Sequence, residues 1–268
     1  MTRLAWLTDI HLDFLNDGEV AAFLETISAA DPDSVLITGD IGEGTTVERY
    51  LHRIADRLGK PIYFVLGNHD YYDRSIAPVR DIMRQINREQ AGRLLWLGDS
   101  APIALTPDTA LVGHDGWSDG RYGDFMASPV VLSDYLRIED LVIPDRAARL
   151  ERLKALGDDA AAHLRGVLPG ALAQNRRVLV ALHPPPFQQA TYYLDTPAAD
   201  DDEYLPHFAC KAVGDLLLEL APQHPDTEIT VLAGHTHHAA DVQPLPNLHV
   251  IVAAAEYGNP VVSRVLEL

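Results

Sequence analysis

The stretch Pro61-Ile62-Tyr63-Phe64-Val65-Leu66-Gly67-Asn68-His69-Asp70 joins a short apolar run to a cluster of polar side chains. Four to seven apolar residues bounded by Gly, Pro or Asp are typical of a buried strand. In an α/β sheet, ligands collect beyond the carboxyl ends of the strands. This decapeptide therefore predicts a strand that carries part of a functional site at its end.

The same pattern recurs along the chain and indicates the fold class. Six further apolar runs end in polar clusters, at 4–7, 34–38, 110–112, 177–182, 228–233 and 248–255. Helical patterns are expected at 19–30, from Thr45 or Thr46 to 58, at 75–89, at 144–168 with an interruption at Gly157, and at 207–220. Strands and helices alternate up to about residue 95, which predicts βαβ units and an α/β protein.

The distribution of the polar clusters predicts a single domain over 1–268. Candidate catalytic and metal-binding residues occur from Asp9 to His237, and no linker separates two independent halves. Two long, turn-rich segments at 114–136 and 187–206 are expected to be loops that shape a binding site.

Composition excludes several classes of function. The chain has 21 Lys and Arg against 39 Asp and Glu, a formal net charge of −18, which disfavours binding to long nucleic acid or to an anionic membrane. Cys210 is the single cysteine, so there is no internal disulfide and no thiolate metal site. No apolar run approaches the roughly 20 residues that span a bilayer, and the first residues do not resemble a signal peptide, so we expect a cytoplasmic protein.

The polar clusters together form a set of metal-ligand candidates. Seven of them are two Asp, one Asn and four His: Asp9, His11, Asp40, Asn68, His183, His235 and His237. His69 is an eighth candidate in the same clusters. Imidazoles and carboxylates without thiolates suit Mn, Fe, Zn or Ni. Eight positions are too many for one transition metal, whereas two ions sharing a bridging carboxylate could use them. In Asp9-x-His11 and His235-x-His237, residues two apart on an extended chain leave on the same side and can aim at one site.

The ordered motifs Asp9-x-His11, Gly39-Asp40, Gly67-Asn68-His69-Asp70, His183 and Gly234-His235-x-His237 resemble those of the calcineurin-like metallophosphoesterase superfamily. The resemblance implies a four-layer αββα β-sandwich flanked by helices. It implies one metal held by Asp9, His11, Asp40 and His237, and a second held by the bridging Asp40 with Asn68, His183 and His235. It also implies that His69 lies beside the scissile phosphate and that Asp70 orients it.

The function implied is hydrolysis of a small, nucleotide-like phosphodiester or phosphomonoester. Two divalent ions (Mn²⁺, Fe²⁺ or Fe³⁺, or Zn²⁺) would bind the phosphoryl oxygens and lower the pKa of a water between them from about 15.7 to roughly 7, which makes hydroxide available. His69 would protonate the leaving alkoxide or hydrogen-bond to it.

Alternatives remain at this stage. Protein Ser/Thr phosphatases of the superfamily have an Arg soon after the second motif, which Gly39-Asp40-Ile41-Gly42-Glu43-Gly44 lacks. The motifs are similar to those of bacterial cyclic-nucleotide phosphodiesterases, although Leu182-His183 stands where those often have two histidines. An inactive metal-binding scaffold of the same fold and a single-zinc hydrolase of an amide or lactam also stay open.

Three residues outside the motifs are candidates for lining the substrate site. His114 follows an apolar run, and Arg121 and Tyr122 lie in the loop after it. Arg121 could bind a phosphate and Tyr122 could stack on a base. The alternative for Arg121 is an ion pair with Asp119 or Asp124.

Overall fold

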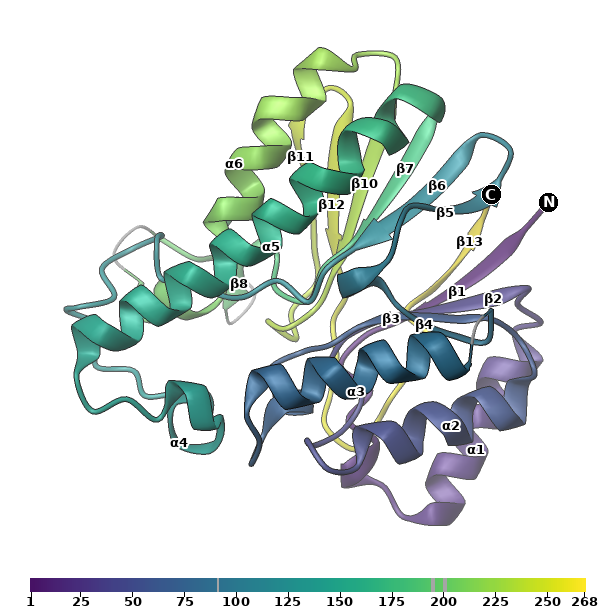
Figure 1. Cartoon of the computed structure of the whole chain (residues 1–268), viewed down its shortest axis with the longest axis horizontal. Coiled ribbons are helices and arrows are strands. Elements are labelled where there is room, and N and C mark those ends of the chain that lie inside the picture. Colours follow the sequence, from purple (N-terminus) through teal and green to yellow (C-terminus); the bar gives the residue numbers. More distant parts are fainter. Residues whose placement is uncertain (91, 194–195, 200–201) are drawn as a thin grey trace.

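Two β-sheets packed face to face form the centre of the computed structural model (Figure 1), which describes residues 1–90, 92–193, 196–199 and 202–268. The first sheet has the order β13-β1-β2-β3-β4 and the second β11-β12-β10-β7-β6-β5, while β8 and β9 form a separate pair. The inner strands of both sheets run parallel, and the outer strands β13, β11 and β5 are antiparallel to their neighbours. The strands are β1 (Arg3–Leu7), β2 (Ser34–Thr38), β3 (Ile62–Val65), β4 (Leu94–Trp96), β5 (Ile103–Thr106), β6 (Thr109–Gly113), β7 (Arg177–Ala181), β8 (Tyr192–Tyr193), β9 (Thr196–Pro197), β10 (Glu228–Ala233), β11 (Ala240–Leu245), β12 (Leu248–Val252) and β13 (Arg264–Glu267).

Helices cover the outer face of each sheet. Figure 1 shows α1, α2 and α3 against the first sheet and α5 and α6 against the second. The α-helices are α1 (Asp17–Ala29), α2 (Val47–Leu58), α3 (Ile76–Glu89), α4 (Asp134–Arg137), α5 (Arg146–Gln174) and α6 (Lys211–Leu220). Short 3₁₀ turns include η1 (Leu12–Phe14), η2 (His69–Tyr71), η4 (Glu139–Leu141) and η6 (Leu205–His207).

Three layers of apolar side chains hold these elements together. Between the sheets, Trp6 and Leu36 of the first sheet are buried with Leu179 and Leu232 of the second. The other two layers lie between each sheet and its helices. Burial of apolar surface stabilises such layers by about 25 cal/mol per Å². The expected four-layer αββα sandwich is confirmed.

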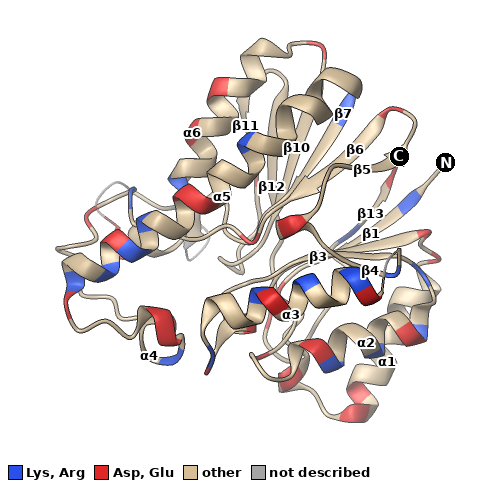
Figure 2. Cartoon of the chain, in the orientation of Figure 1, with Lys and Arg blue, Asp and Glu red and all other residues tan. Residues whose placement is uncertain are grey.

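Charged residues lie mainly on the helices and are sparse on the inner strands (Figure 2). This distribution follows from the sandwich, because the parallel strands are covered on both faces and their side chains are apolar. Among the described residues, no helix is both long and apolar enough to cross a lipid bilayer.

The interruption expected at Gly157 is wrong, because α5 continues through Gly157 and Pro169 to Gln174. Burial of Leu164, Leu168 and Leu172 against the second sheet offsets the helix-breaking tendencies of Gly and Pro. Gly157 has another role: a Cβ there would lie 2.7 Å from the Cβ of Asp119. The glycine therefore allows the loop after β6 to pack directly on the helix.

The two segments expected to be loops differ in how much regular structure they contain. No helix or strand occurs between the end of β6 and α4, and Asp119 fixes this segment by accepting a hydrogen bond from the Ala212 N–H at 2.8 Å. In the segment 187–206, the described residues include the β8–β9 pair and η6, while 194–195 and 200–201 lie outside the described residues. Helix α6 begins at Lys211, later than expected, because His207 belongs to the turn η6.

Candidate metal centre

Polar residues from both sheets meet at the carboxyl ends of five parallel strands. From the first sheet, Asp9 and His11 follow β1, Asp40 follows β2, and Asn68 and His69 follow β3. From the second sheet, His183 follows β7, and His235 and His237 follow β10. The face-to-face packing of the sheets therefore brings together all eight residues singled out in the sequence.

The backbone at this edge is unusual. Among the described residues, seven that are not glycine have positive φ, and five of these are the candidate ligands Asp9, His11, Asp40, His235 and His237. Such left-handed conformations cost about 1–3 kcal/mol each and concentrate at functional sites. The Asp-x-His and His-x-His segments are therefore sharply turned rather than extended, which corrects the expectation of an extended chain. The turned backbone aims Asp9 and His11 at the same group of ligand atoms, whereas His237 joins that group and His235 points to Asn68 beside it.

The first ligand group consists of Asp9, His11, Asp40 and His237, whose ligand atoms all lie within 4.8 Å of one another. The two imidazole Nε2 atoms of His11 and His237 are 3.3 Å apart, and Nε2 of His237 is 3.3 Å from Oδ1 of Asp9. Ligands bound at about 2.1 Å to one ion are separated by about 3.0–3.5 Å. The spacing in this group fits a transition-metal ion.

The second group centres on the side-chain oxygen of Asn68. Oδ1 of Asn68 lies 3.1 Å from Nε2 of His183 and 3.0 Å from Nδ1 of His235. Oδ2 of Asp40 is 3.5 Å from the same Nε2 of His183. Nitrogen and oxygen atoms alone converge here, a donor set that suits the same class of metals as the first group.

Asp40 connects the two groups. Its Oδ2 lies 3.6 Å from Nε2 of His11 and 3.5 Å from Nε2 of His183. Burial alone would raise the pKa of this carboxyl group, but the charge of His183 holds that pKa well below its usual range. In the same way, burial works to lower the pKa of His183, yet Asp40 and Asp9 raise it to about 10. The carboxylate therefore lies between one imidazole of each ligand group, as a bridging ligand would.

Backbone carbonyls select the tautomers of two histidines. His183 donates its Nδ1–H to the Thr38 carbonyl at 2.9 Å, which leaves Nε2 as the ligand atom. His235 donates its Nε2–H to the His207 carbonyl at 3.1 Å, which leaves Nδ1 toward Asn68. Such outer partners fix the orientation of metal-binding imidazoles. Burial and the neighbouring His183 lower the pKa of His235 to about 4.

His69 lies beside this centre without joining either group. Its ring packs on His11 at a centroid distance of 4.6 Å and on Tyr72 at 4.3 Å, and its buried Nδ1 has no hydrogen-bond partner. Asp70 does not orient it, contrary to what the resemblance implies. The Asp70 carboxylate instead accepts backbone N–H groups of Ile41, Gly42 and Gly67. Asp70 therefore holds together the two loops that carry Asp40 and Asn68.

A model of one protein family extends over almost the whole of the chain. The model, described as calcineurin-like phosphoesterase, matches residues 2–239. The chain belongs to the calcineurin-like phosphoesterase family. It is therefore a metal-dependent hydrolase of phosphoric esters, and its family uses a dinuclear metal centre. No curated protein shows a significant match to the sequence of this phosphoesterase.

Solved structures share the fold of this phosphoesterase. A phosphopantetheinyl hydrolase from Mycobacterium tuberculosis is similar with a TM-score of 0.68 and 16% identity, over 96% of this chain and 90% of the other. A dimetal phosphatase from Danio rerio is similar with a TM-score of 0.55 and 13% identity, over 94% of this chain and 87% of the other. At these identities the likeness concerns the fold.

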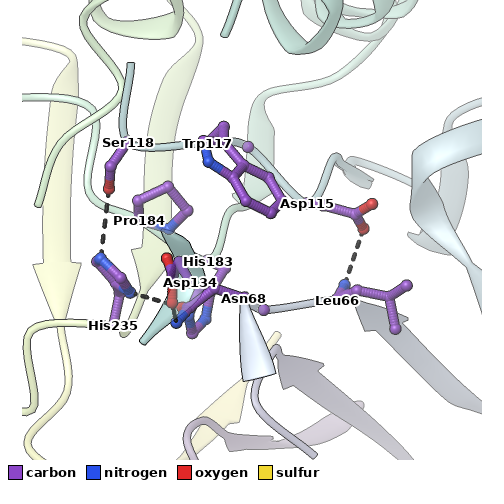
Figure 3. A pocket seen from close by; sticks show the side chains of 11 residues that line it. Leu66, Asn68, Asp115, Trp117, Ser118, Asp134, His183, Pro184 and His235 are labelled. Carbon is purple, nitrogen blue, oxygen red and sulfur yellow. Dashed lines mark hydrogen bonds between the residues drawn. The ribbon is translucent and has the colours of Figure 1, made fainter. Parts of the chain in front are cut away.

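The sequence did not point to Asp134, which lies beside the second ligand group (Figure 3). Oδ1 of Asp134 accepts hydrogen bonds from Nδ2 of Asn68 and from the Tyr72 hydroxyl, each at 2.9 Å. With Trp117, Ser118 and Pro184, Asp134 also lines a small cavity of about 20 Å³ behind Asn68 and His235. Asp134 begins α4 within the irregular segment after β6, where no periodic pattern marked it.

His114, Arg121 and Tyr122 do not line the cavity next to the ligand groups. His114 is buried, and its Nδ1 accepts a hydrogen bond from the Gly116 N–H at 3.0 Å. Arg121 pairs with Asp119 at 2.8 Å and with Asp158 at 2.7 Å, the first of which was its expected alternative partner. Tyr122 lies near the Lys211 ammonium, which is 5.8 Å from the ring centroid. The three side chains hold the loop after β6 in place.

Proposed function

We propose that this phosphoesterase hydrolyses a small phosphodiester or phosphomonoester at a centre of two transition-metal ions. The observation that carries the proposal is the position of Oδ2 of Asp40 between two converging sets of donors. Asp9, His11, Asp40 and His237 would hold one ion, and Asp40, Asn68, His183 and His235 the other.

The cavity beside these ligands limits the size and charge of the substrate. It has a volume of about 190 Å³ and reaches Asp40, Asn68 and His69. Its described lining contains no Lys or Arg, so the two bound ions would supply the positive charge that binds the phosphoryl oxygens and activates water. The small cavity supports a small ester rather than a protein or a long nucleic acid.

His69 is suited to act on the leaving group. Its ring lines the cavity, and its position is fixed by His11 on one side and Tyr72 on the other. An imidazolium proton delivered to the leaving alkoxide oxygen raises the rate by about 10²–10⁴-fold in comparable enzymes. Ring packing against His11 and Tyr72, rather than a hydrogen bond to the buried Nδ1, holds the imidazole in place.

Hydrolysis of bis-p-nitrophenyl phosphate and p-nitrophenyl phosphate by the manganese-loaded protein tests the proposal. We expect turnover of at least one ester, loss of turnover after chelation, and about two metal equivalents per chain. Asp40→Ala should retain fewer than two equivalents, since it removes the shared carboxylate. Two bound ions with no turnover would indicate an inactive scaffold, and one bound ion would indicate a single-zinc hydrolase.

The role of His69 is tested with the same assay and a second class of ester. His69→Ala should keep both metal equivalents, because the ring lies outside both ligand groups. Its turnover should fall about 10²-fold or more on an alkyl ester, whose leaving group needs the proton, and much less on p-nitrophenyl esters. Full activity on the alkyl ester at unchanged metal content would remove His69 from the reaction.

We also propose a cytoplasmic location and no membrane or long nucleic-acid partner. The charge of −18 supports the exclusion of these partners, and the lack of a long apolar run supports the location.

A further inference from the structure

Two aromatic rings lie at the rim of the metal centre and remain largely exposed. Phe14, at the end of η1, is 53% exposed, and Tyr257, in the segment between β12 and β13, is 47% exposed. Their ring centroids are 4.8 Å apart, with an interplanar angle of 38°. Exposed apolar side chains that adjoin one another, rather than lying singly, are a feature of binding sites.

Tyr257 connects this aromatic pair with the ligand residues. Its ring centroid lies 4.5 Å from that of His11 and 4.7 Å from that of His237, and Tyr257 lines the same cavity as Asp40 and His69. The backbone of its segment is tied to the centre, because the Ala255 N–H donates to the His237 carbonyl at 3.2 Å. Tyr257 lies beyond residue 239, outside the part of the chain that the family model matches.

The surroundings define the chemistry of the group that these rings would contact. Leu132 and Phe208 add apolar surface to the cavity lining, whereas Asp134 is the one carboxylate there besides Asp40. Among the described lining residues no Lys or Arg is present to bind a second phosphate. A neutral, planar group fits these surroundings, and a polyphosphate does not.

The geometry points to Phe14 and Tyr257 as a stacking platform for a planar, uncharged ring, such as a nucleobase, carried by the phosphoester substrate. The inference rests on the proposed function and specifies its substrate class. Phosphoryl oxygens would be held at the metal centre while the ring of the ester group stacks at the rim. Base–aromatic stacking of this kind contributes about 5- to 150-fold in affinity per base.

Two diesters with the same leaving group test the platform. Thymidine 5′-p-nitrophenyl phosphate carries a base, whereas methyl p-nitrophenyl phosphate does not. For Tyr257→Leu we expect kcat/KM to fall about 10-fold or more on the thymidine ester and to stay within about twofold on the methyl ester. Phe14→Leu should also lower kcat/KM on the thymidine ester more than on the methyl ester. Tyr257→Phe, which keeps the ring, should retain the parent protein's preference for the thymidine ester.

Val261→Ala is the matched control, because Val261 is exposed in the same segment but does not line the cavity. Val261→Ala should leave kcat/KM unchanged on both esters. An equal loss on both esters in Tyr257→Leu would overturn the platform and show that Tyr257 supports the metal centre. An unchanged kcat/KM of Tyr257→Leu on both esters would also overturn the platform.

A binding measurement separates failure of the platform from failure of the proposed function. Calorimetric titration of the metal-loaded protein uses 5′-deoxythymidine 5′-phosphonate and methylphosphonate, whose carbon–phosphorus bonds are not hydrolysed. Tighter binding of the thymidine compound, lost in Tyr257→Leu, supports the platform even if neither diester is cleaved. Equal binding of both compounds contradicts it even if both diesters are cleaved.

Discussion

Asn68 can face a metal ion with either end of its side-chain amide, and Asp134 determines which end it presents. The Asp134 carboxylate accepts a hydrogen bond from Nδ2 at 2.9 Å, so Oδ1 is left toward His183 and His235. Partners of this kind typically change metal affinity by about 10- to 100-fold when they are removed. Asp134 is therefore a positioning residue for the second ion.

Asp134→Ala should weaken binding of one of the two metal ions by about 10- to 100-fold. The other ion should be little affected, since the hydrogen bonds of Asp134 go to Asn68 and Tyr72 and not to the first ligand group. Metal titration followed by elemental analysis measures both affinities. Asp134→Asn is the control, because its carbonyl oxygen can accept the same bond. Equal weakening of both ions in Asp134→Ala would contradict this role.

At this scale the sequence predicted the residues that follow strands and missed those in irregular segments. Asp9, Asp40 and Asn68 were found because an apolar run of strand length places the next polar residue at a sheet edge. Asp134 and Tyr257 belong to segments without periodicity, whose path depends on tertiary contacts. The role of Asp70 was wrong for a related reason: which backbone N–H groups surround a carboxylate is set by how two loops meet.

Helix α5 shows how one glycine can serve packing instead of ending an element. Substituting Gly by Ala inside an exposed helix stabilises it by about 0.5–1 kcal/mol. At Gly157 the added Cβ would lie 2.7 Å from the Cβ of Asp119 and 3.0 Å from its carboxylate. Gly157→Ala should therefore destabilise the protein by about 1–3 kcal/mol, as overpacking does.

Gly166→Ala, in the same helix, is the matched control, since nothing lies within 4 Å of a Cβ there. It should stabilise by about 0.5–1 kcal/mol. Urea unfolding of the two variants beside the parent protein measures both changes. If both Gly157→Ala and Gly166→Ala stabilise the protein, the loop after β6 can move away from α5 without cost.

The start of α3 depends on a carboxylate from another element. Asp140 in η4 accepts hydrogen bonds from the Ser75 hydroxyl at 2.6 Å and the Ile76 N–H at 2.7 Å, and it pairs with Arg152 at 2.8 Å. Partial burial alone would raise the pKa of this carboxyl group, but these three partners lower it below its usual value of 3.8. A depressed pKa means that the ionised form stabilises the fold above pH 3.8, and that this stability is lost as the pH falls through the folded-state value.

Asp140→Ala should therefore lower the free energy of unfolding by about 1 kcal/mol at pH 7, as loss of a helix cap does. The difference from the parent protein should shrink as the pH is lowered below 3.8, because the parent carboxyl group is then protonated. Urea unfolding at pH 7, 5 and 3 in the presence of a chelator measures it. If the difference in unfolding free energy stays constant over this pH range, the partners assigned to the Asp140 carboxylate are wrong.

Among the elements, the inner parallel strands were predicted, whereas the edge strands β4, β5, β11 and β13 were not. β2 and β10 match their predicted ranges, since both are continuous apolar runs bounded by turn residues. β11 contains Pro244, and β13 is half exposed, so neither shows a buried run. Outer strands take their place from pairing with a neighbour, which a local pattern does not reveal.

For the whole molecule, the metal centre joins the two sheets. Asp9, Asp40 and Asn68 belong to the first sheet, and His183 and His235 to the second. Each ion would thus be bound by side chains from both sheets and would oppose their separation. A ligand that binds only the folded state stabilises it by about 2.7 kcal/mol at a free concentration 100 times its dissociation constant.

Adding Mn²⁺ to the chelator-treated protein should raise Tm by about 5–10 °C, given about 2–4 °C per kcal/mol for a protein of this size. Calorimetry measures the shift, and Asp40→Ala, which lacks the shared ligand, should show a smaller one. Hydrogen exchange should slow in the loops after β1 and after β10 together. Slowing confined to one sheet would contradict binding between the sheets.

The left-handed backbone at Asp9, His11, Asp40, His235 and His237 implies a trade-off between folding stability and function. Glycine adopts such angles without strain, so each of these positions carries a backbone cost that glycine would avoid. A variant library screened for heat resistance under chelation should accumulate glycine there and lose metal binding with every gain. Selection for turnover is what keeps this edge of the molecule less stable than it could be.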